Sequence, residues 1–394
     1  MPVLGQKSQS VIAEYVLTTS QTWTAPKSGT IKVTCTGAGG NGAYGQGNAN
    51  AYGSGSKSSA GGGAGGFAQK TVVVTAGDTY TVVIGAGGDN HTNTDQESGE
   101  AGGESTFDNA TATEAIALDS NGGGGGVFNT GDNNGAAGGA GGTASGGDVN
   151  YTGGAGGTTS RASASVKSMV TGGGAVNVLG LATPPRGGNL SARGSNVSPY
   201  QSGGGGVGGN GGDFATNTAN LNTQAVITQG GSSIASAPVL DENGAFNAET
   251  STRLLGTVPY APVPTNRDQL DVSGSVADQY FFSPNSGSGE SILSSLDFTD
   301  HAYRGGCGTW AGYGSTTSSA NAARIQMLDP GAFAGAGGMQ WVNENSANTS
   351  ANQWRTPNGG LGGGGGGGAT IVSTVNNYVF TKGGNGIVII QYIG

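Results

Sequence analysis

The sequence is poor in the residues on which most enzymes and nucleic-acid-binding proteins depend. It has two histidines and two cysteines in 394 residues, and neither His91 nor His301 lies beside a metal-ligand spacing or a nucleophile motif. Charged residues make up 10% of the chain, and 15 lysines and arginines stand against 24 acidic residues. Binding to phosphate needs a basic surface. The sequence therefore predicts no enzyme, no metal or other cofactor and no nucleic-acid partner.

Long apolar runs are also missing. No stretch approaches the ~20 apolar residues that cross a bilayer, and residues 1–20 have no apolar centre of a secretion signal. We therefore expect neither membrane insertion nor classical export. Two cysteines exclude a disulfide scaffold, and Cys35 and Cys307 are expected to be free thiols.

Glycine takes the place of these residues, with 83 of 394 positions, roughly three times the usual ~7%. In several glycine tracts the side chains fall at every third position, for example at Ala137, Ala140 and Thr143 in one and at Val207, Asn210 and Asp213 in another. A period of three is that of an extended left-handed helix. Its bare faces would let neighbouring backbones bond to each other. This predicts packed polyglycine helices, with loose glycine-rich loops as the alternative.

Between the tracts, short apolar segments are predicted to form β-strands. Residues 31–36 alternate, with Ile31, Val33 and Cys35 on one face. Residues 71–75 and 79–84, around a turn at 76–78, predict a β-hairpin. Residues 115–118 form a shorter candidate, and 370–372 and 378–380 are expected to pair.

The last segment, 387–393, is apolar on both faces. Such a strand is central in a sheet or lies at a subunit interface. A single glycine-rich chain offers little surface to cover it, so we expect Ile387, Ile389 and Ile393 to lie at the interface of a homotrimer.

Several motifs occur in a characteristic order. They are Thr-Trp-Thr-Ala-Pro at 22–26, Gly-Thr-Ile-Lys-Val at 29–33, Gly-Ala-Gly-Gly at 37–40, Gly-Gly-Phe-Ala at 65–68 before the apolar run 71–84, Gly-Gly-Glu-Ser-Thr-Phe at 102–107 and Gly-Gly-Asn-Gly-Ile-Val-Ile-Ile at 383–390. Together they resemble the glycine-rich domain of tailed-bacteriophage tail fibres and receptor-binding tips. The resemblance covers about residues 15–126 and 359–394. It implies a mainly β virion structural domain, often trimeric, sometimes with packed polyglycine helices.

The expected fold is mainly β: a glycine-rich β-sandwich-like domain with polyglycine tracts and a long inserted region. We expect an N-terminal arm for attachment or assembly at 1–20 and a discontinuous glycine-rich β domain at 21–126 plus 359–394. A glycine-tract region at 127–236 and an acidic, aromatic-containing insertion at 237–358 complete the chain. Most of the net charge of −9 comes from residues 237–301 of the insertion.

Aromatic side chains near the end of the insertion are candidates for a recognition surface. Tyr303, Arg304, Trp310 and Tyr313 lie among glycines, and aromatic anchors on loops are common at binding surfaces. The alternative is that they form part of a small core, which is the expectation for Phe281, Phe282 and Phe333. We treat the first four residues as contacts to a receptor or partner protein.

These observations favour a non-enzymatic phage virion protein, made in the host cytoplasm and placed at the tail more readily than at the capsid. It would be a tail fibre or receptor-binding tip that attaches by passive multivalent binding. Its partners would be its own copies, other virion proteins and a host surface glycan or protein. The alternatives are a capsid-attached fibre or decoration protein, a glycan depolymerase and a glycine-rich cell-surface structural protein.

Overall fold

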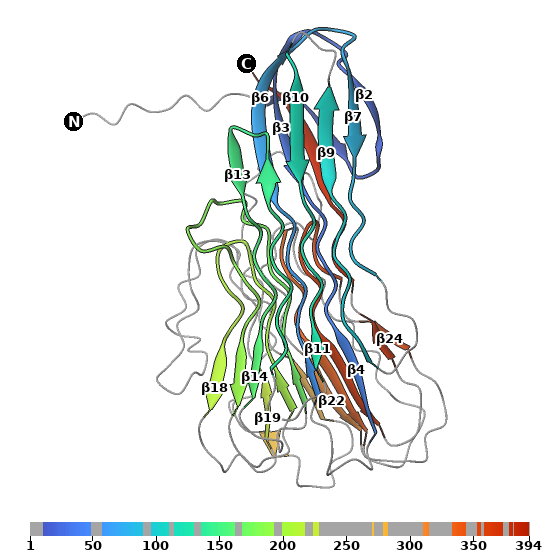
Figure 1. Cartoon of the computed structure of the whole chain (residues 1–394), viewed down its shortest axis with the longest axis vertical. Coiled ribbons are helices and arrows are strands. Elements are labelled where there is room, and N and C mark those ends of the chain that lie inside the picture. Colours follow the sequence, from blue (N-terminus) through green and yellow to red (C-terminus); the bar gives the residue numbers. More distant parts are fainter. Residues whose placement is uncertain are drawn as a thin grey trace, which may run out of the picture.

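The computed structural model describes residues 11–48, 57–89, 96–109, 114–129, 135–161, 168–192, 199–216, 224–227, 270–271, 279–282, 310–314, 333–343, 353–355, 358–372, 378–380 and 382–393. These residues form strands and extended segments, with no α-helix among them. The fold is therefore mainly β, as the helix-breaking glycine content predicts. Figure 1 shows an elongated molecule with strands at both ends, joined by undulating segments along the long axis.

The upper end in Figure 1 is a β-sandwich of two antiparallel sheets. One sheet has the order β1 (Val11–Leu17), β27 (Ile387–Ile393), β3 (Gly29–Thr36), β6 (Phe67–Val74) and β13 (Val149–Tyr151). The other has the order β12 (Ala144–Ser145), β10 (Ile116–Ser120), β9 (Ser105–Asn109), β7 (Thr79–Val83) and β2 (Gln21–Thr24). Residues 11–17, expected in an N-terminal arm, thus belong to the sandwich.

Aromatic rings fill the space between the two sheets. Tyr80 and Phe107 stack with ring centroids 4.8 Å apart, and Trp23 lies 5.5 Å from Tyr80 and 6.4 Å from Tyr392. All four side chains are buried, with at most 7% of Trp23 exposed. Each buried aromatic removes a large apolar area from water. This cluster is part of the apolar core of the sandwich.

The strand predictions are confirmed in part. Ile31, Val33 and Cys35 are fully buried on one face of β3, as their alternation indicates. The hairpin at 71–84 is wrong, because β6 and β7 lie in different sheets. The turn around Gly77, whose φ is +92°, carries the chain across the sandwich instead.

Below the sandwich the glycine tracts bond to one another in steps of three residues. Gly62 and Gly65 donate backbone hydrogen bonds to one neighbouring segment, to the carbonyls of Gly365 and Gly362. Gly63 and Gly66 donate to another segment, to the carbonyls of Gly124 and Asn121. A partner that recurs every third residue fits an extended helix with three residues per turn. The helical conformation of the tracts stays a prediction.

Tract 60–66 lies inside the bundle. Its backbone exchanges hydrogen bonds with segments on every side, namely 37–43, 121–124, 139–142, Gly154, Gly174 and 362–365. Segment 171–176 is surrounded in the same way. Tracts from 127–236 therefore alternate in space with tracts from 37–126 and 359–394, and the backbone itself is the main packing surface.

The period of three also decides which positions carry side chains. In segment 135–143, Ala137, Ala140 and Thr143 are exposed, whereas Gly139 and Gly142 are buried. A Cβ at Gly139 would overlap the carbonyl oxygen of Gly124. The glycines therefore lie where a neighbouring segment of the same chain leaves no room for a side chain.

Residues 203–213 differ from the predicted continuous tract. Gly206 and Gly209 form a two-way backbone bridge, and the chain reverses between them. Val207, at the turn, is 9% exposed and packs into a second apolar cluster. The three-residue period of the sequence thus continues through a turn, so the period alone does not predict where this tract ends.

That second cluster joins the sandwich to the glycine bundle. It consists of Ala64, Phe67, Val176, Val207, Phe333, Ile387 and Ile389. Phe333 is 4% exposed, which confirms its predicted place in a core. The cluster covers the face of β27 that does not look into the sandwich, so the two parts share one apolar contact.

The reason for placing the last strand at a subunit interface is that a single glycine-rich chain offers little surface to cover it, and the structure removes that reason. Ile387, Ile389 and Ile393 are 0%, 2% and 8% exposed within a single chain. On the other face, Val388, Ile390 and Tyr392 lie in the sandwich core. Strand β27 is central, between β1 and β3. Of the two alternatives for a strand that is apolar on both faces, a central strand or a subunit interface, β27 is the central strand. Its burial requires no second subunit.

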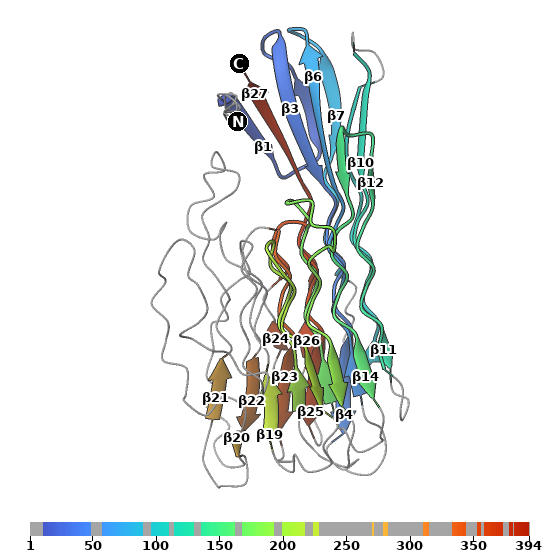
Figure 2. The ribbon, with the colours of Figure 1, turned by 90° about the vertical axis from the view of Figure 1, so that its left-hand side faces the viewer.

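Strands at the lower end continue the tracts, and many of them pair in parallel (Figure 2). One sheet has the order β11 (Phe128–Asn129), β5 (Lys57–Ser59), β15 (Ser168–Val170), β17 (Pro199–Gln201), β19 (Gln224–Ile227), β20 (Leu270–Asp271). Another has the order β21 (Gln279–Phe282), β22 (Trp310–Gly314), β23 (Met339–Asn343), β25 (Gly368–Val372), β4 (Tyr44–Asn48), β8 (Gln96–Glu97). The smaller sheets are β14 (Thr159–Arg161), β16 (Leu190–Ala192), β18 (Phe214–Thr216) and β24 (Gln353–Arg355), β26 (Tyr378–Phe380).

The expected pairing of 370–372 with 378–380 is wrong. Strand β25 pairs with β23 and β4, whereas β26 pairs with β24, each of them in parallel. Consecutive strands here belong to different tracts, and their partners are decided by tract packing.

Candidate functional site

The lower end carries three neighbouring strands with many aromatic residues. In the backbone register, Trp310 of β22 is opposite Phe282 of β21 and Met339 of β23. Gly312, in turn, is opposite Tyr280 and Trp341. Figure 2 shows these strands at the end of the molecule that lies opposite the sandwich. The fold therefore brings together three aromatic segments, at 280–282, 310–313 and 341, each about 30 residues from the next along the chain.

The structure places two of the four predicted contact residues. Trp310 and Tyr313 lie on β22, in a strand where the sequence indicated a glycine-framed loop. Glycine-flanked aromatic residues also suit a strand, because Trp and Tyr have high β propensity. Tyr303 and Arg304 lie outside the described residues, so the four-residue site remains a prediction. The register with Phe282 is a feature that the sequence analysis missed.

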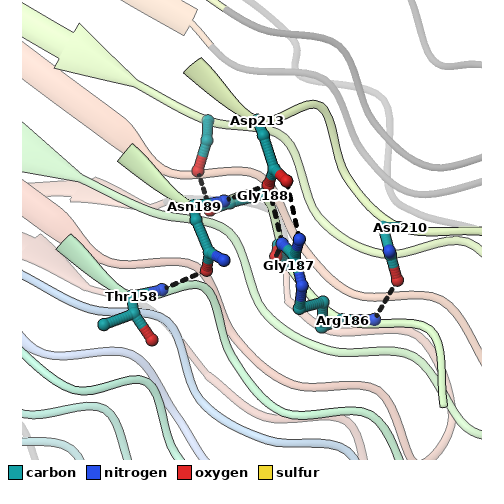
Figure 3. A network of polar contacts seen from close by, with 8 residues as sticks. Thr158, Arg186, Gly187, Gly188, Asn189, Asn210 and Asp213 are labelled. Carbon is teal, nitrogen blue, oxygen red and sulfur yellow. Dashed lines mark hydrogen bonds and ion pairs between the residues drawn. The ribbon is translucent and has the colours of Figure 1, made fainter. Parts of the chain in front are cut away.

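A polar network fastens the edge of the glycine bundle (Figure 3). Arg186 donates two hydrogen bonds to the Asp213 carboxylate, at 2.7 Å and 2.6 Å, and the Asn189 amide donates a third at 2.7 Å. The Arg186 amide donates to the side chain of Asn210, and the Thr158 amide donates to the side chain of Asn189. Three tracts are thus joined by side chains where they reach the surface.

The pKa of Asp213 reflects this arrangement. Partial burial would raise the pKa of the carboxyl group, but the hydrogen bonds from Arg186 and the Asn189 amide, with the guanidinium charge, outweigh it. The pKa of Asp213 is therefore lowered. The sequence offered no direct signal of the pair, since Arg186 and Asp213 are 27 residues apart.

Replacing Asp213 by asparagine is expected to destabilise the chain at neutral pH and to have no effect in strong acid. A carboxyl group with a lowered pKa in the folded state stabilises it above the unfolded pKa of ~3.9. That stabilisation disappears as the pH falls through the folded pKa. The Asp213 side chain is 52% exposed, so solvent screening limits the loss to about 1 kcal/mol or less.

Thermal melts from pH 7 to about pH 2 measure this loss for Asp213→Asn. Asn210→Ala is the matched control, because it removes a hydrogen bond to the same Arg186 without changing a titrating group. Its destabilisation should not vary with pH. A pH-independent Asp213→Asn effect would show that the ion pair does not contribute.

Two buried titratable groups of the sandwich, Cys35 and Tyr80, are held in their neutral forms by burial. Burial raises the pKa of the Cys35 thiol to about 12, and its Sγ donates to the Ser105 carbonyl at 3.3 Å. Burial likewise raises the pKa of Tyr80 to about 12. A thiol with a high pKa and no access to solvent is inert. Cys35 is a free thiol, as predicted, whereas Cys307 lies outside the described residues.

Within the ranges given above, no three His, Cys, Asp or Glu side chains gather closely enough to hold a metal ion. The same residues include no helix with the length and apolar character needed to cross a membrane.

Comparison with known proteins assigns the chain to a family. No curated protein matches the chain in sequence. A protein-family model described as a glycine-rich domain matches residues 16–393. The match includes both sheets of the sandwich from Val16 onward, every tract of the bundle and the strands at the lower end. The chain therefore belongs to the glycine-rich domain family.

Proposed function

We propose that the chain is a virion structural protein of a tailed bacteriophage, acting as a tail fibre or receptor-binding tip. What supports this is the separation of its two ends by a bundle of tracts that bond to one another through their backbones. Such a body keeps its shape without a large apolar core. The sandwich end would join the particle, and the opposite end would meet the host surface.

The lower end suits repeated, variable contacts. Strands β4 and β5, β14 and β15, and β16 and β17 are consecutive in the chain, and each belongs to one of the sheets at this end. The chain therefore reverses here again and again, while the tracts above supply a fixed support. Binding residues are often carried on loops that a rigid scaffold positions. Several weak sites on one particle would raise the effective concentration at the cell surface.

The aromatic strands β21, β22 and β23 are the proposed contact region. Trp310 and Tyr313 lie there, and aromatic rings are frequent energetic anchors in recognition. The ligand would be a host surface glycan or protein, and Tyr303 and Arg304 would add to the same surface. No cofactor or chemical step is involved, because the proposed function is passive binding.

The substitution Trp310→Ala is expected to reduce attachment to host cells by ~2 kcal/mol or more, if Trp310 is an anchor. The thermal melt of the protein should stay nearly unchanged, since a contact residue contributes little to folding. Cell adsorption of labelled protein measures the first quantity, and circular dichroism measures the second. Phe107→Ala is the control for lost folding, because Phe107 is fully buried in the distant sandwich.

Unfolding of Trp310→Ala would make Trp310 a core residue and remove the proposed contact. Labelling of intact particles with an antibody to this chain tests the location separately. Label at the tail supports the proposal, label at capsid vertices favours a capsid fibre or decoration protein, and absence from purified particles would falsify the virion assignment.

A further inference from the structure

The two edges of the sandwich sheet β1-β27-β3-β6-β13 differ in how their outward backbone groups are covered. At one edge, β6 extends beyond its short partner β13, which ends its pairing opposite Gln69. The backbone amides further along this edge are capped by carboxylates. The Thr71 amide donates to Asp148 Oδ2 and the Val73 amide donates to Glu114 Oε2, both at 2.9 Å. Side chains of this kind keep a free edge from recruiting another strand.

At the other edge, no side chain among the described residues caps the backbone of β1 in this way. Hydrogen-bonding direction alternates along antiparallel strands, so the outward amides of Thr71 and Val73 fix the direction in β3, β27 and β1 through the register. By this alternation Tyr15 and Leu17 bond to β27, whereas the amides and carbonyls of Glu14 and Val16 face the open side. Across the part of the chain that the structure describes, we find no partner for these outward groups.

The open edge also exposes apolar side chains. Ile12 is 60% and Val16 is 38% exposed. Glu14 lies between them, opposite Gln391 of β27, whose Nε2 donates to Glu14 Oε2 at 2.6 Å. No cation pairs with Glu14 among the described residues. A long apolar edge strand of this kind attracts another strand.

We propose that β1 is a docking edge for an extended segment of a different polypeptide, in which apolar, basic and apolar side chains alternate. Backbone hydrogen bonds to Glu14 and Val16 would supply affinity. The basic side chain would pair with Glu14, and the apolar ones would cover Ile12 and Val16. This inference does not depend on the proposed virion role.

Charge complementarity argues for a different chain over a second copy. Two antiparallel β1 strands centred on Glu14 would place the two carboxylates directly opposite each other, which is destabilising. Shifting the register by two residues would place Glu14 opposite Val16 or Ile12 and leave the carboxylate unpaired. A strand with Lys or Arg at the central position avoids both costs.

A synthetic peptide, acetyl-Thr-Val-Thr-Lys-Thr-Val-Thr-amide, is the probe for this edge. With the full chain, its binding is followed by fluorescence anisotropy of a labelled form and by slower hydrogen exchange at the Glu14 and Val16 amides. We expect binding detectable at about 1 mM peptide and weaker binding of the same peptide with Glu in place of Lys. Glu14→Lys should reverse this preference.

Val16→Pro removes one outward amide but no hydrogen bond to β27, and proline is tolerated on an edge strand. It should weaken peptide binding by about tenfold or more, with an unchanged circular dichroism melt. Val73→Pro is the matched control, because it makes the same change at the opposite, capped edge and should leave binding intact.

Three results would overturn the proposal: no binding of the Lys peptide, equal binding by Val16→Pro and the unaltered chain, or loss of binding in Val73→Pro alone. Analytical ultracentrifugation adds the test for a second copy. Self-association that Val16→Pro abolishes would make another copy of this chain the occupant, against the proposal.

Discussion

Replacing Gly139 by valine is expected to destabilise the chain by about 3 kcal/mol or more, since overpacking a tight contact typically costs 1–3 kcal/mol and this contact is backbone against backbone. A Cβ at this position would overlap the Gly124 carbonyl oxygen and would approach the Gly63 amide nitrogen. Segment 135–143 would have to move away from tracts 60–66 and 121–127, and its backbone hydrogen bonds to Gly61 and Gly124 would be lost away from water. Urea unfolding monitored by tryptophan fluorescence measures the change.

Ala140→Val is the matched control, one residue further along the same tract. Ala140 is exposed and lies in the phase that already carries side chains. Its substitution should change stability by less than about 0.5 kcal/mol, as is usual for surface positions. Similar destabilisation by both variants would mean that the tracts are not packed against each other through their glycine faces.

The second large effect is expected in the sandwich. Phe107→Ala should cost about 3–5 kcal/mol, the range for truncating a buried aromatic residue. The Phe107 ring is fully buried, stacks on Tyr80 and lies 6.2 Å from Trp23. The cavity would lie within the aromatic cluster, between Tyr80 and Trp23. Thermal and urea unfolding of the purified variant measure the loss.

Val73→Ala provides the comparison within the same sandwich. Val73 is 59% exposed on β6, so its truncation should change stability by less than about 0.5 kcal/mol. If Phe107→Ala were as mild as Val73→Ala, the aromatic cluster would not be what holds the two sheets together.

The buried and exposed positions of several strands and tracts could be predicted from the local periodicity of the sequence. The alternation of Ile31, Val33 and Cys35 gave the buried face of β3, because the side-chain period of a strand is two. The period of three at Ala137, Ala140 and Thr143 indicated which phase of that tract would carry side chains, and those residues are exposed. Such signals depend only on neighbours in the chain, so one sequence is enough to see them.

Pairing could not be predicted in the same way. A turn such as the one at Gly77 can have the same sequence whether it connects the two strands of a hairpin or connects strands in two different sheets. The burial of Ile387 and Ile389 depends on Phe333 and Val176, which are far away in the sequence. An apolar strand without visible cover therefore looked like a subunit interface.

The candidate contact region illustrates the same limit. The sequence singled out Trp310 and Tyr313 as glycine-framed aromatics, but their strand neighbours come from residues 279–282 and 339–343. The Arg186–Asp213 pair was missed because a charged residue in a glycine tract has no local partner. Both features arise only when distant tracts are laid side by side.

The recurrence of hydrogen-bond partners every third residue limits how such a chain can change in length. Inserting one residue into tract 60–66 would move every later residue of the tract to the next face and point Ala64 or Phe67 at a neighbour's carbonyl groups. Inserting three would restore the faces but shift the end of the tract by about 9 Å, out of step with the strands at both ends. Insertions and deletions in relatives should therefore avoid the tracts and accumulate where the chain reverses. The length of the glycine bundle would then stay constant while the segments at its ends vary.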